Sequence, residues 1–238
     1  MIKINDSGFY LGYKKYEENS GIIFILSKKN GLIKSFTKFS KKNTKSFMIL
    51  DEIDFTWKSK QLGGLGYVNI DLKKSNYFES HYLHTLIKSS AGELCLNFLP
   101  LWQSNVLTYN DITNLKKVTN DKPKTMILKY VWWEVFFLKN NGYGLNLNKC
   151  AVTGSKDDIY YLSPKSGNSV SYSEGKKFHN KLFVIPECLK SSSINFNYSD
   201  FQEALKITGY FLNKNFESNL AKLVFRNQLI EKIISFEK

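Results

Sequence analysis

Few side chains in this sequence have the types and spacing that catalysis or metal binding requires. His81 and His84 are three residues apart and could share a helix face, but a metal site would need ligands beyond these two. The adjacent Asp157 and Asp158 could contact a cation, although neighbouring acids of this kind are usually solvated. The sequence also contains none of the common motifs of P-loop proteins, serine hydrolases, zinc proteases or zinc deaminases. We therefore predict no catalytic residue, no bound metal and no cofactor.

Glu134 is the one acid in the most apolar segment, residues 126–138, in which 11 of 13 residues are apolar. A lone carboxylate is costly to bury unless a partner compensates its charge. Lys129 and Arg226, the only arginine, are the possible partners. We predict a structural ion pair and not a catalytic role, because no second acid or base is evident nearby.

A run of lysines with no acid extends from residue 28 to residue 45. Lysines neutralise phosphates and release counterions, and aromatic faces stack on unpaired bases. Phe36 and Phe39 lie among the lysines and could stack, although a core or half-buried position is the more common role. Six phosphate contacts would give a slope of about −4 for log binding constant against log salt on single strands. The lysines of this segment are Lys28, Lys29, Lys34, Lys38, Lys41, Lys42 and Lys45.

The charge of the whole chain points in the same direction. Thirty-four basic residues face 21 acidic ones, and residues 1–78 alone hold 14 lysines against 7 acids. Such an excess favours a polyanionic partner, either nucleic acid or an acidic membrane surface. An AT-rich genome would explain the preference for lysine over arginine, but it does not explain the shortage of acids. The lysine-rich segment lacks the apolar face of a membrane-surface helix, so nucleic acid is favoured and no membrane partner is expected.

Cysteine usage and hydropathy indicate the compartment. Cys95, Cys150 and Cys188 form an odd, scattered set, which is typical of a reducing compartment and not of a disulfide framework. The first six residues have no apolar run of a signal peptide. Residues 126–138 fall short of the roughly 20 residues that a membrane span needs. We expect a soluble, cytoplasmic protein.

The lysine-rich segment lies within a series of short β-rich runs. Asn30-Gly31 is a strong hairpin signal between two of them, because both residue types tolerate positive φ. Five short strands with glycines at the corners suit a small closed barrel such as an OB-fold, and an SH3-like barrel fits the same pattern. The expected strands are residues 8–16, 21–27, 32–36, 47–58 and 65–72.

Helical spacing begins near Asn76, which forms a capping-box pattern with Glu79. Helices are predicted over residues 106–118 and from Pro123 to Asn140, the second apolar almost all round and therefore buried. Residues 148–186 form a small β-like insertion, after which Ser199 and Gln202 begin further helices. The predicted class is α+β, with a barrel (1–76), a helical domain in two parts (77–147 and 187–238) and the insertion (148–186).

Several segments together resemble the RecO family in order and spacing over almost the whole chain. Residues 130–154 read YVWWEVFFLKNNGYGLNLNKCAVTG, which is similar to the family's central helix and its entry into a zinc-ribbon-like insertion. Residues 161–171 (YLSPKSGNSVS) and 182–189 (LFVIPECL) continue the match. At the front, residues 8–20 resemble the first strand and turn, residues 31–42 the basic hairpin loop, and residues 57–66 the next strands.

The resemblance implies an N-terminal OB-fold, a helical domain and a small insertion. It further implies a DNA repair and recombination mediator, not an enzyme, that binds single- and double-stranded DNA and anneals complementary strands. RecR, the acidic tail of the single-stranded-DNA-binding protein and, indirectly, RecA are the implied partners. Lys38 and Lys41 fall on basic positions of the family's loop, and Arg226 falls on a basic position of its last helix.

One departure from the family pattern concerns zinc. Relatives that carry the metal have two pairs of cysteines in the insertion. Here the four positions are Cys150, Thr153, Ser171 and Glu174, and a single thiolate cannot hold a structural tetrahedral zinc. We therefore predict a degenerate zinc-ribbon-like insertion, stabilised by packing and by hydrogen bonds in its turns.

Charge alone extends the predicted nucleic-acid-binding set to Lys14, Lys15, Lys28, Lys29, Lys34, Lys38, Lys41, Lys42, Lys45, Lys58 and Lys60. Candidate partner-binding residues are Lys116, Lys117, Lys124 and Lys129. The principal alternative is a general single-stranded nucleic-acid-binding OB-fold protein or RNA chaperone, which would need neither the helical part nor a protein partner. A nuclease with a carboxylate metal site and a purely structural protein are further alternatives.

Overall fold

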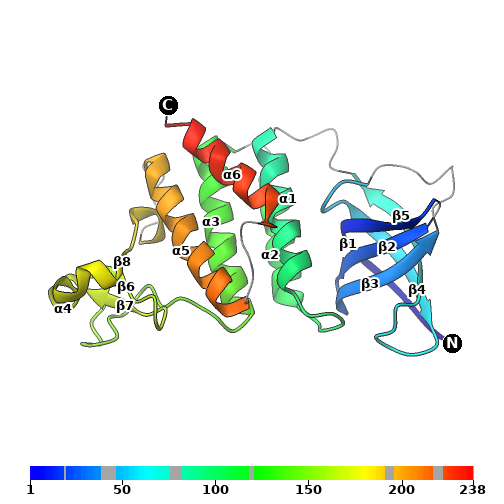
Figure 1. Ribbon diagram of the computed structural model, residues 1–238, viewed down its shortest axis with the longest axis horizontal. Coiled ribbons are helices and arrows are strands. Elements are labelled where there is room, and N and C mark those ends of the chain that lie inside the picture. The colour runs from blue at the N-terminus through cyan, green and yellow to red at the C-terminus, as the bar shows by residue number, and fades with distance from the viewer. Residues whose placement is uncertain are drawn as a thin grey trace. The chain divides into compact units, whose positions relative to one another are not determined.

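The computed structural model describes residues 1–18, 20–38, 47–75, 82–117, 121–190, 196–216 and 222–237 (Figure 1). The chain forms two compact units, Met1–Thr119 and Asn120–Lys238. Some residues of the sequence predictions lie outside the described ranges, namely Phe39, Lys41, Lys42, Lys45, Asn76, Glu79 and His81. Among the described residues, no helix is both long enough and apolar enough to cross a membrane.

Five strands form a closed barrel in the first unit, in the order β1-β2-β3-β5-β4 (Figure 1). Neighbours pair in antiparallel fashion except β3 and β5, which pair in parallel between Phe36 and Tyr67. This arrangement confirms the predicted five-stranded barrel and is consistent with an OB-fold. The strands are β1 (Ile2–Glu17), β2 (Ser20–Ser27), β3 (Gly31–Lys38), β4 (Glu52–Ser59) and β5 (Tyr67–Lys74).

The strand boundaries differ from the sequence prediction by at most two residues, except at the starts of β1 and β4, where the difference is larger. β1 begins earlier, at Ile2, because its first half pairs with β4 while its second half pairs with β2. β4 begins later, at Glu52, because Leu50 has a positive φ of 64° that an extended strand does not allow. The predicted Asn30-Gly31 hairpin is present between β2 and β3, and Gly31 has a φ of 71°.

Alternating side chains of the strands fill the barrel. Burial alternates along β2, β3 and β4, so that every second residue points inward. Trp102, which follows the first helix, packs on the core: its ring lies 4.5 Å from that of Trp57, and its backbone N–H donates to the Leu32 carbonyl at 2.8 Å. The core comprises Tyr10, Ile23, Ile25, Ile33, Ile53, Phe55, Trp57 and Val68.

Helices α1 (Tyr82–Phe98) and α2 (Val106–Lys116) belong to the same unit as the barrel. Gly92 of α1 allows a close approach, since a Cβ there would lie 2.3 Å from the Ile49 Cγ2 atom. Asn105 caps α2 by accepting a hydrogen bond from the Thr108 N–H at 3.2 Å. The first unit therefore contains these two helices as well as the barrel. The predicted domain boundary at residue 76, between the barrel and the helical domain, stays a prediction.

In the second unit, α3 (Pro123–Asn140) packs against α5 (Tyr198–Phe216), which packs against α6 (Val224–Ser235). The predicted start and end of α3 are confirmed, and Gly142 beyond its end has a φ of 88°. The start of α5 is capped differently from the prediction, because the N–H of Asn197 donates to the Asp200 carboxylate at 3.1 Å. Ser199 and Gln202 lie inside that helix.

Glu134 is fully buried in α3, and Arg226 of α6 is its partner. The guanidinium donates to both carboxylate oxygens, at 2.8 and 3.0 Å, and to the Leu205 carbonyl at 2.7 Å. The Tyr130 hydroxyl donates to the same carboxylate at 2.7 Å, and the Thr208 hydroxyl is a further donor. The predicted structural ion pair is confirmed with Arg226, whereas Lys129 pairs with Asp121 at 2.7 Å.

The insertion contains a three-stranded sheet in the order β7-β6-β8. Its elements are β6 (Ile159–Leu162), β7 (Ser169–Ser171), α4 (Tyr172–Gly175), the 3-10 helix η2 (Lys176–Lys181), β8 (Phe183–Val184) and the 3-10 helix η3 (Glu187–Leu189). Cys150 and Ser171 come together: the Ser171 backbone N–H donates to the Cys150 sulfur at 3.3 Å. Burial alone would raise the pKa of Cys150, but hydrogen bonds from Thr153 and Ser171 outweigh it and lower the pKa to about 6. Among the described residues, no group of three or more His, Cys, Asp or Glu side chains is placed so that it could hold a metal ion.

Candidate nucleic-acid interface

A row of outward-facing residues crosses the strands near one end of the barrel. Lys14 of β1 pairs with Ile22 of β2, which pairs with Phe36 of β3. Phe36 in turn pairs with Tyr67 of β5, which pairs with Lys58 of β4. Directly paired residues project from the same side of a sheet, so this row places aromatic side chains between two lysines.

Three aromatic rings meet at this row, because Tyr16 of β1 contacts Phe36 from outside it. The ring of Phe36 lies edge-on to Tyr67 at 5.1 Å and to Tyr16 at 6.2 Å between centroids. Tyr67 is 60% exposed and Tyr16 is 70% exposed, whereas Phe36 is partly buried. The backbone N–H of Phe36 donates to the Gly66 carbonyl at 3.1 Å and holds the backbone of Phe36 beside the start of β5. Proteins that bind single-stranded nucleic acids stack unpaired bases on exposed aromatic rings of this kind.

Lysines flank the rings: Lys14, Lys38 and Lys58 are exposed, and Lys34 is half-buried. Lys38 follows Phe36 at the end of β3, and Lys34 lies on the next outward position of the same strand. Among the described residues, no carboxylate forms an ion pair with Lys14, Lys34, Lys38 or Lys58. Their ammonium groups are therefore available to phosphates. We call this surface the barrel face and define it by Lys14, Tyr16, Lys34, Phe36, Lys38, Lys58 and Tyr67.

Other predicted lysines lie elsewhere. Lys28 and Lys29 are at the opposite end of the β2–β3 hairpin from Lys38, about 24 Å away along eight-residue strands. At that end the backbone N–H of Lys29 donates to the carboxylate of Asp6 at 3.0 Å. The lysines of residues 28–38 thus do not form a single cluster. Lys15 projects from the side of β1 opposite to Lys14, and Lys60 follows the end of β4.

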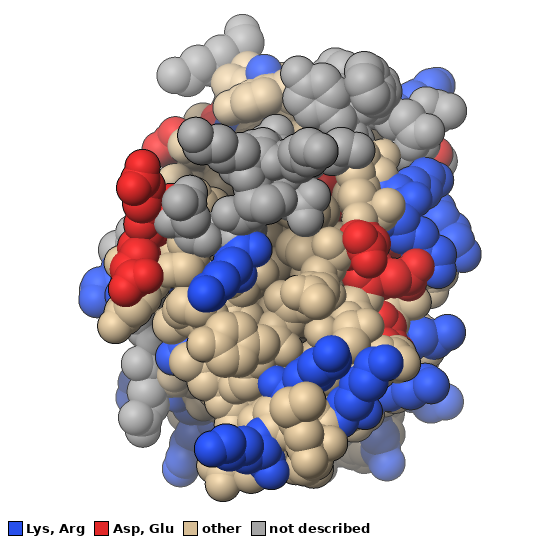
Figure 2. Space-filling model, turned by 90° about the vertical axis from the view of Figure 1, so that its right-hand side faces the viewer, with Lys and Arg blue, Asp and Glu red and all other residues tan. Residues whose placement is uncertain are grey.

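Asp54 and Asp71 lie away from the barrel face, whereas Glu17 lies at its edge, because Glu17 pairs with Ser20, which pairs with Lys38. Asp54 pairs with Asp71 across β4 and β5, about 13 Å along β4 from Lys58. Asp54 also forms an ion pair with Lys73 at 3.7 Å. Figure 2 shows a broad uncharged area with lysines around its lower part, and acids to its left and right that lie next to further lysines.

Sequence reasoning missed Lys3, Tyr16 and Tyr67. Lys3 pairs with Lys58 and extends the same row onto the first half of β1. Tyr16 reaches the outer face because the register of β1 shifts between Lys15 and Glu17. The alternation in residues 65–72 indicated on which side of its strand Tyr67 projects. Its position beside Phe36 depends on the strand order, in which β5 pairs with β3.

The four candidate partner-binding lysines are divided between the two units. Lys116 has a side chain only 8% exposed, and it forms an ion pair with Glu52 at 2.9 Å. Burial lowers the pKa of Lys116, and the hydrogen bond to Glu52 offsets part of that effect. Lys117 is exposed, Lys124 lies over the Tyr198 ring at 5.4 Å, and Lys129 is held by Asp121. Lys117 is therefore the one of the four that is exposed and forms no ion pair with a described residue.

The chain is similar to known proteins over nearly its full length. Residues 89–223 match the family profile described as Recombination protein O C terminal. The DNA repair protein RecO of Ehrlichia chaffeensis is 30% identical over 246 residues, which covers 98% of each chain. RecO of Rickettsia canadensis is 31% identical over 98% of this chain and 97% of its own, and RecO of Wolbachia pipientis wMel is 28% identical over 90% of this chain and 92% of its own. The chain therefore belongs to the RecO family of DNA repair proteins.

Proposed function

We propose that this RecO-family protein binds single- and double-stranded DNA through the barrel face and anneals complementary strands. The observation that carries the proposal is the cross-strand row in which Phe36 and Tyr67 stand between Lys14 and Lys58. Rings and ammonium groups in one row match the alternation of bases and phosphates in a single strand. Duplex DNA would use the lysines alone, since its bases are already stacked.

Annealing needs no covalent chemistry in this scheme. Two DNA strands repel each other through their phosphates, and lysines that neutralise one strand lower the barrier to base pairing. The four lysines of the barrel face, each in contact with one phosphate, would give a salt slope of about −3 on single strands. Further lysines from residues 39–46 would make that slope steeper.

We further propose that the protein, together with RecR, helps to load RecA onto DNA coated by the single-stranded-DNA-binding protein. The acidic tail of the coating protein requires basic side chains, and residues 79–238 supply 20 basic against 14 acidic residues. Lys117 of the first unit and Lys124 of the second are separate candidate contacts among the described residues. A general single-strand binder or RNA chaperone would share the barrel face but would not need a contact with a protein partner.

The decisive experiment is annealing of complementary oligonucleotides that the single-stranded-DNA-binding protein already coats. We expect the wild-type protein to accelerate annealing, and the variant with Tyr16→Ala, Tyr67→Ala and Lys38→Glu to lose most of the acceleration. The control is Lys29→Glu, which makes the same change of charge at the opposite end of the hairpin and should retain it. Circular dichroism and thermal melting establish that each variant is folded.

The outcomes separate the alternatives. Annealing of bare strands without annealing of coated strands would indicate a general binder. Divalent-metal-dependent cleavage of the DNA would indicate a nuclease. Equal loss in Lys29→Glu and in the barrel-face variant would refute the assignment to the barrel face.

A further inference from the structure

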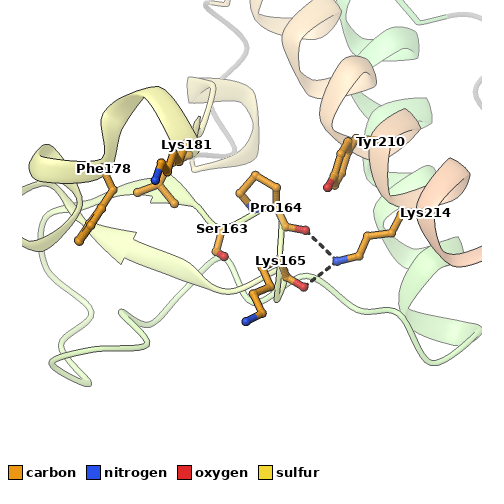
Figure 3. A pocket seen from close by; sticks show the side chains of 8 residues that line it. Ser163, Pro164, Lys165, Phe178, Lys181, Tyr210 and Lys214 are labelled. Atoms are coloured by element: carbon orange, nitrogen blue, oxygen red, sulfur yellow. Dashed lines mark hydrogen bonds between the residues drawn. The ribbon is translucent and has the colours of Figure 1, made fainter.

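An open groove of about 560 Å3 lies in the second unit, between the insertion and α5. Pro164 and Lys165, in the turn between β6 and β7, form one wall, and Tyr210 and Lys214 of α5 form another. Phe178 and Lys181 of η2 complete the lining (Figure 3). This volume falls in the roughly 300–1,000 Å3 range of small-ligand sites, enough for one or two nucleotides.

The charge of the groove is entirely positive. Lys165, Lys181 and Lys214 contribute ammonium groups, and no carboxylate lines it. Lys214 donates to the carbonyls of Pro164 and Lys165, at 2.9 and 2.6 Å, and so bridges α5 to the turn (Figure 3). Lys165 and Lys181 are exposed, and within the described part of the chain neither forms an ion pair. Three uncompensated cations around one groove favour a polyanion.

Two aromatic side chains accompany these lysines. Phe178 is 57% exposed and Tyr210 is 41% exposed. The ring of Tyr210 is held edge-on by Phe183 at 5.2 Å and by Phe211 at 5.3 Å between centroids. Exposed rings beside lysines provide the two contacts that single-stranded nucleic acids use, stacking for bases and charge for phosphates.

We propose that this groove is a second single-strand site, distinct from the barrel face, that accepts one or two nucleotides. Lys165 and Lys181 contact phosphates, and Tyr210 or Phe178 stacks on a base. Lys214 positions the groove wall and keeps one N–H for the strand. The inference rests on the proposed annealing function, because a protein that pairs two strands must hold both.

An acidic peptide is the competing ligand, and the wall of the groove argues against it. Peptides in grooves commonly gain affinity from hydrogen bonds to exposed backbone groups. The carbonyls of Pro164 and Lys165 already accept from the Lys214 ammonium group. Stacking on the rings does not require those carbonyls.

The test is photo-crosslinking of the full chain to an oligonucleotide of 5-iododeoxyuridine, followed by mass spectrometric mapping of the modified peptides. We expect adducts on the peptides that contain Phe178 or Tyr210. The double variant Lys165→Glu and Lys181→Glu should reduce these adducts at least fivefold. The control variant Lys156→Glu and Lys206→Glu reverses the charge of two exposed lysines of the same unit that lie outside the groove. It should leave the yield of groove adducts unchanged.

Each outcome has one meaning. Groove adducts that are absent, or that persist in Lys165→Glu and Lys181→Glu, overturn the inference. Barrel-face adducts at Tyr16, Phe36 or Tyr67 test the proposed function separately, so that either site can fail while the other stands. A fluorescent acidic peptide whose binding, unlike that of the oligonucleotide, depends on Lys165 and Lys181 would assign the groove to a protein partner and also overturn it.

Discussion

Replacement of Arg226 by alanine should strongly destabilise the second unit. The change removes both hydrogen bonds to Glu134, whose carboxylate is fully buried, and the bond to the Leu205 carbonyl. Tyr130 and Thr208 remain as donors, but they carry no charge to balance the carboxylate. Breaking a buried ion pair by removing one partner costs about 3–5 kcal/mol. For a chain of this size that corresponds to a fall in melting temperature of roughly 10 °C.

Differential scanning calorimetry or urea unfolding measures the effect. The double variant Glu134→Leu and Arg226→Met, which removes both charges, should recover most of the lost stability. The control is Lys206→Ala, which breaks the exposed pair with Glu203 and should cost less than about 0.5 kcal/mol. An Arg226→Ala protein that melts within about 2 °C of wild type would refute the reasoning, as would a double variant no more stable than Arg226→Ala.

Three further predictions concern the first unit. Burial, reinforced by the charges of Lys88 and Lys116, lowers the pKa of His84 to about 4, so the unfolded chain takes up a proton first as the pH falls from about 6.5 to 4. Stability should therefore fall in that window by on the order of 3 kcal/mol in urea titrations, and His84→Leu should remove that part of the pH dependence. Gly31→Ala should lower the free energy of unfolding by about 2 kcal/mol or more, because the φ of residue 31 is 71° and the new Cβ would lie 1.7 Å from the Gln103 carbonyl oxygen. A urea midpoint equal to that of wild type would contradict this prediction. Lys116→Met should destabilise the unit by roughly 1–3 kcal/mol, because Glu52 loses its partner, and Glu52→Gln should then add little in a double-mutant cycle.

Local patterns predicted the secondary structure well. The Asn30-Gly31 turn, the start of α3 at Pro123 and the β-like character of residues 148–186, which contain β6, all follow from residue types and short-range spacing. The burial of Glu134 followed from its apolar neighbours, and Arg226 was one of two candidate partners. The choice between them depended on a contact over 92 residues of sequence, which periodicity does not encode.

The candidate site was harder to predict for the same reason. Lysine content identified the barrel, but strand order and register decide which lysines share a face. Lys28 and Lys38 are close in sequence yet lie at opposite ends of one hairpin. Tyr67 is remote from Phe36 in sequence and becomes its neighbour only when β5 closes the barrel against β3.

The salt dependence of single-strand binding tests the barrel face most directly. Fluorescence anisotropy with a labelled oligothymidine should give a straight line of log binding constant against log salt concentration. Replacing Lys14, Lys38 and Lys58 together by glutamine should make that slope shallower by about 2, with a slope of about −0.7 lost per phosphate contact. An unchanged slope would mean that these ammonium groups do not contact the strand, and it would contradict the account.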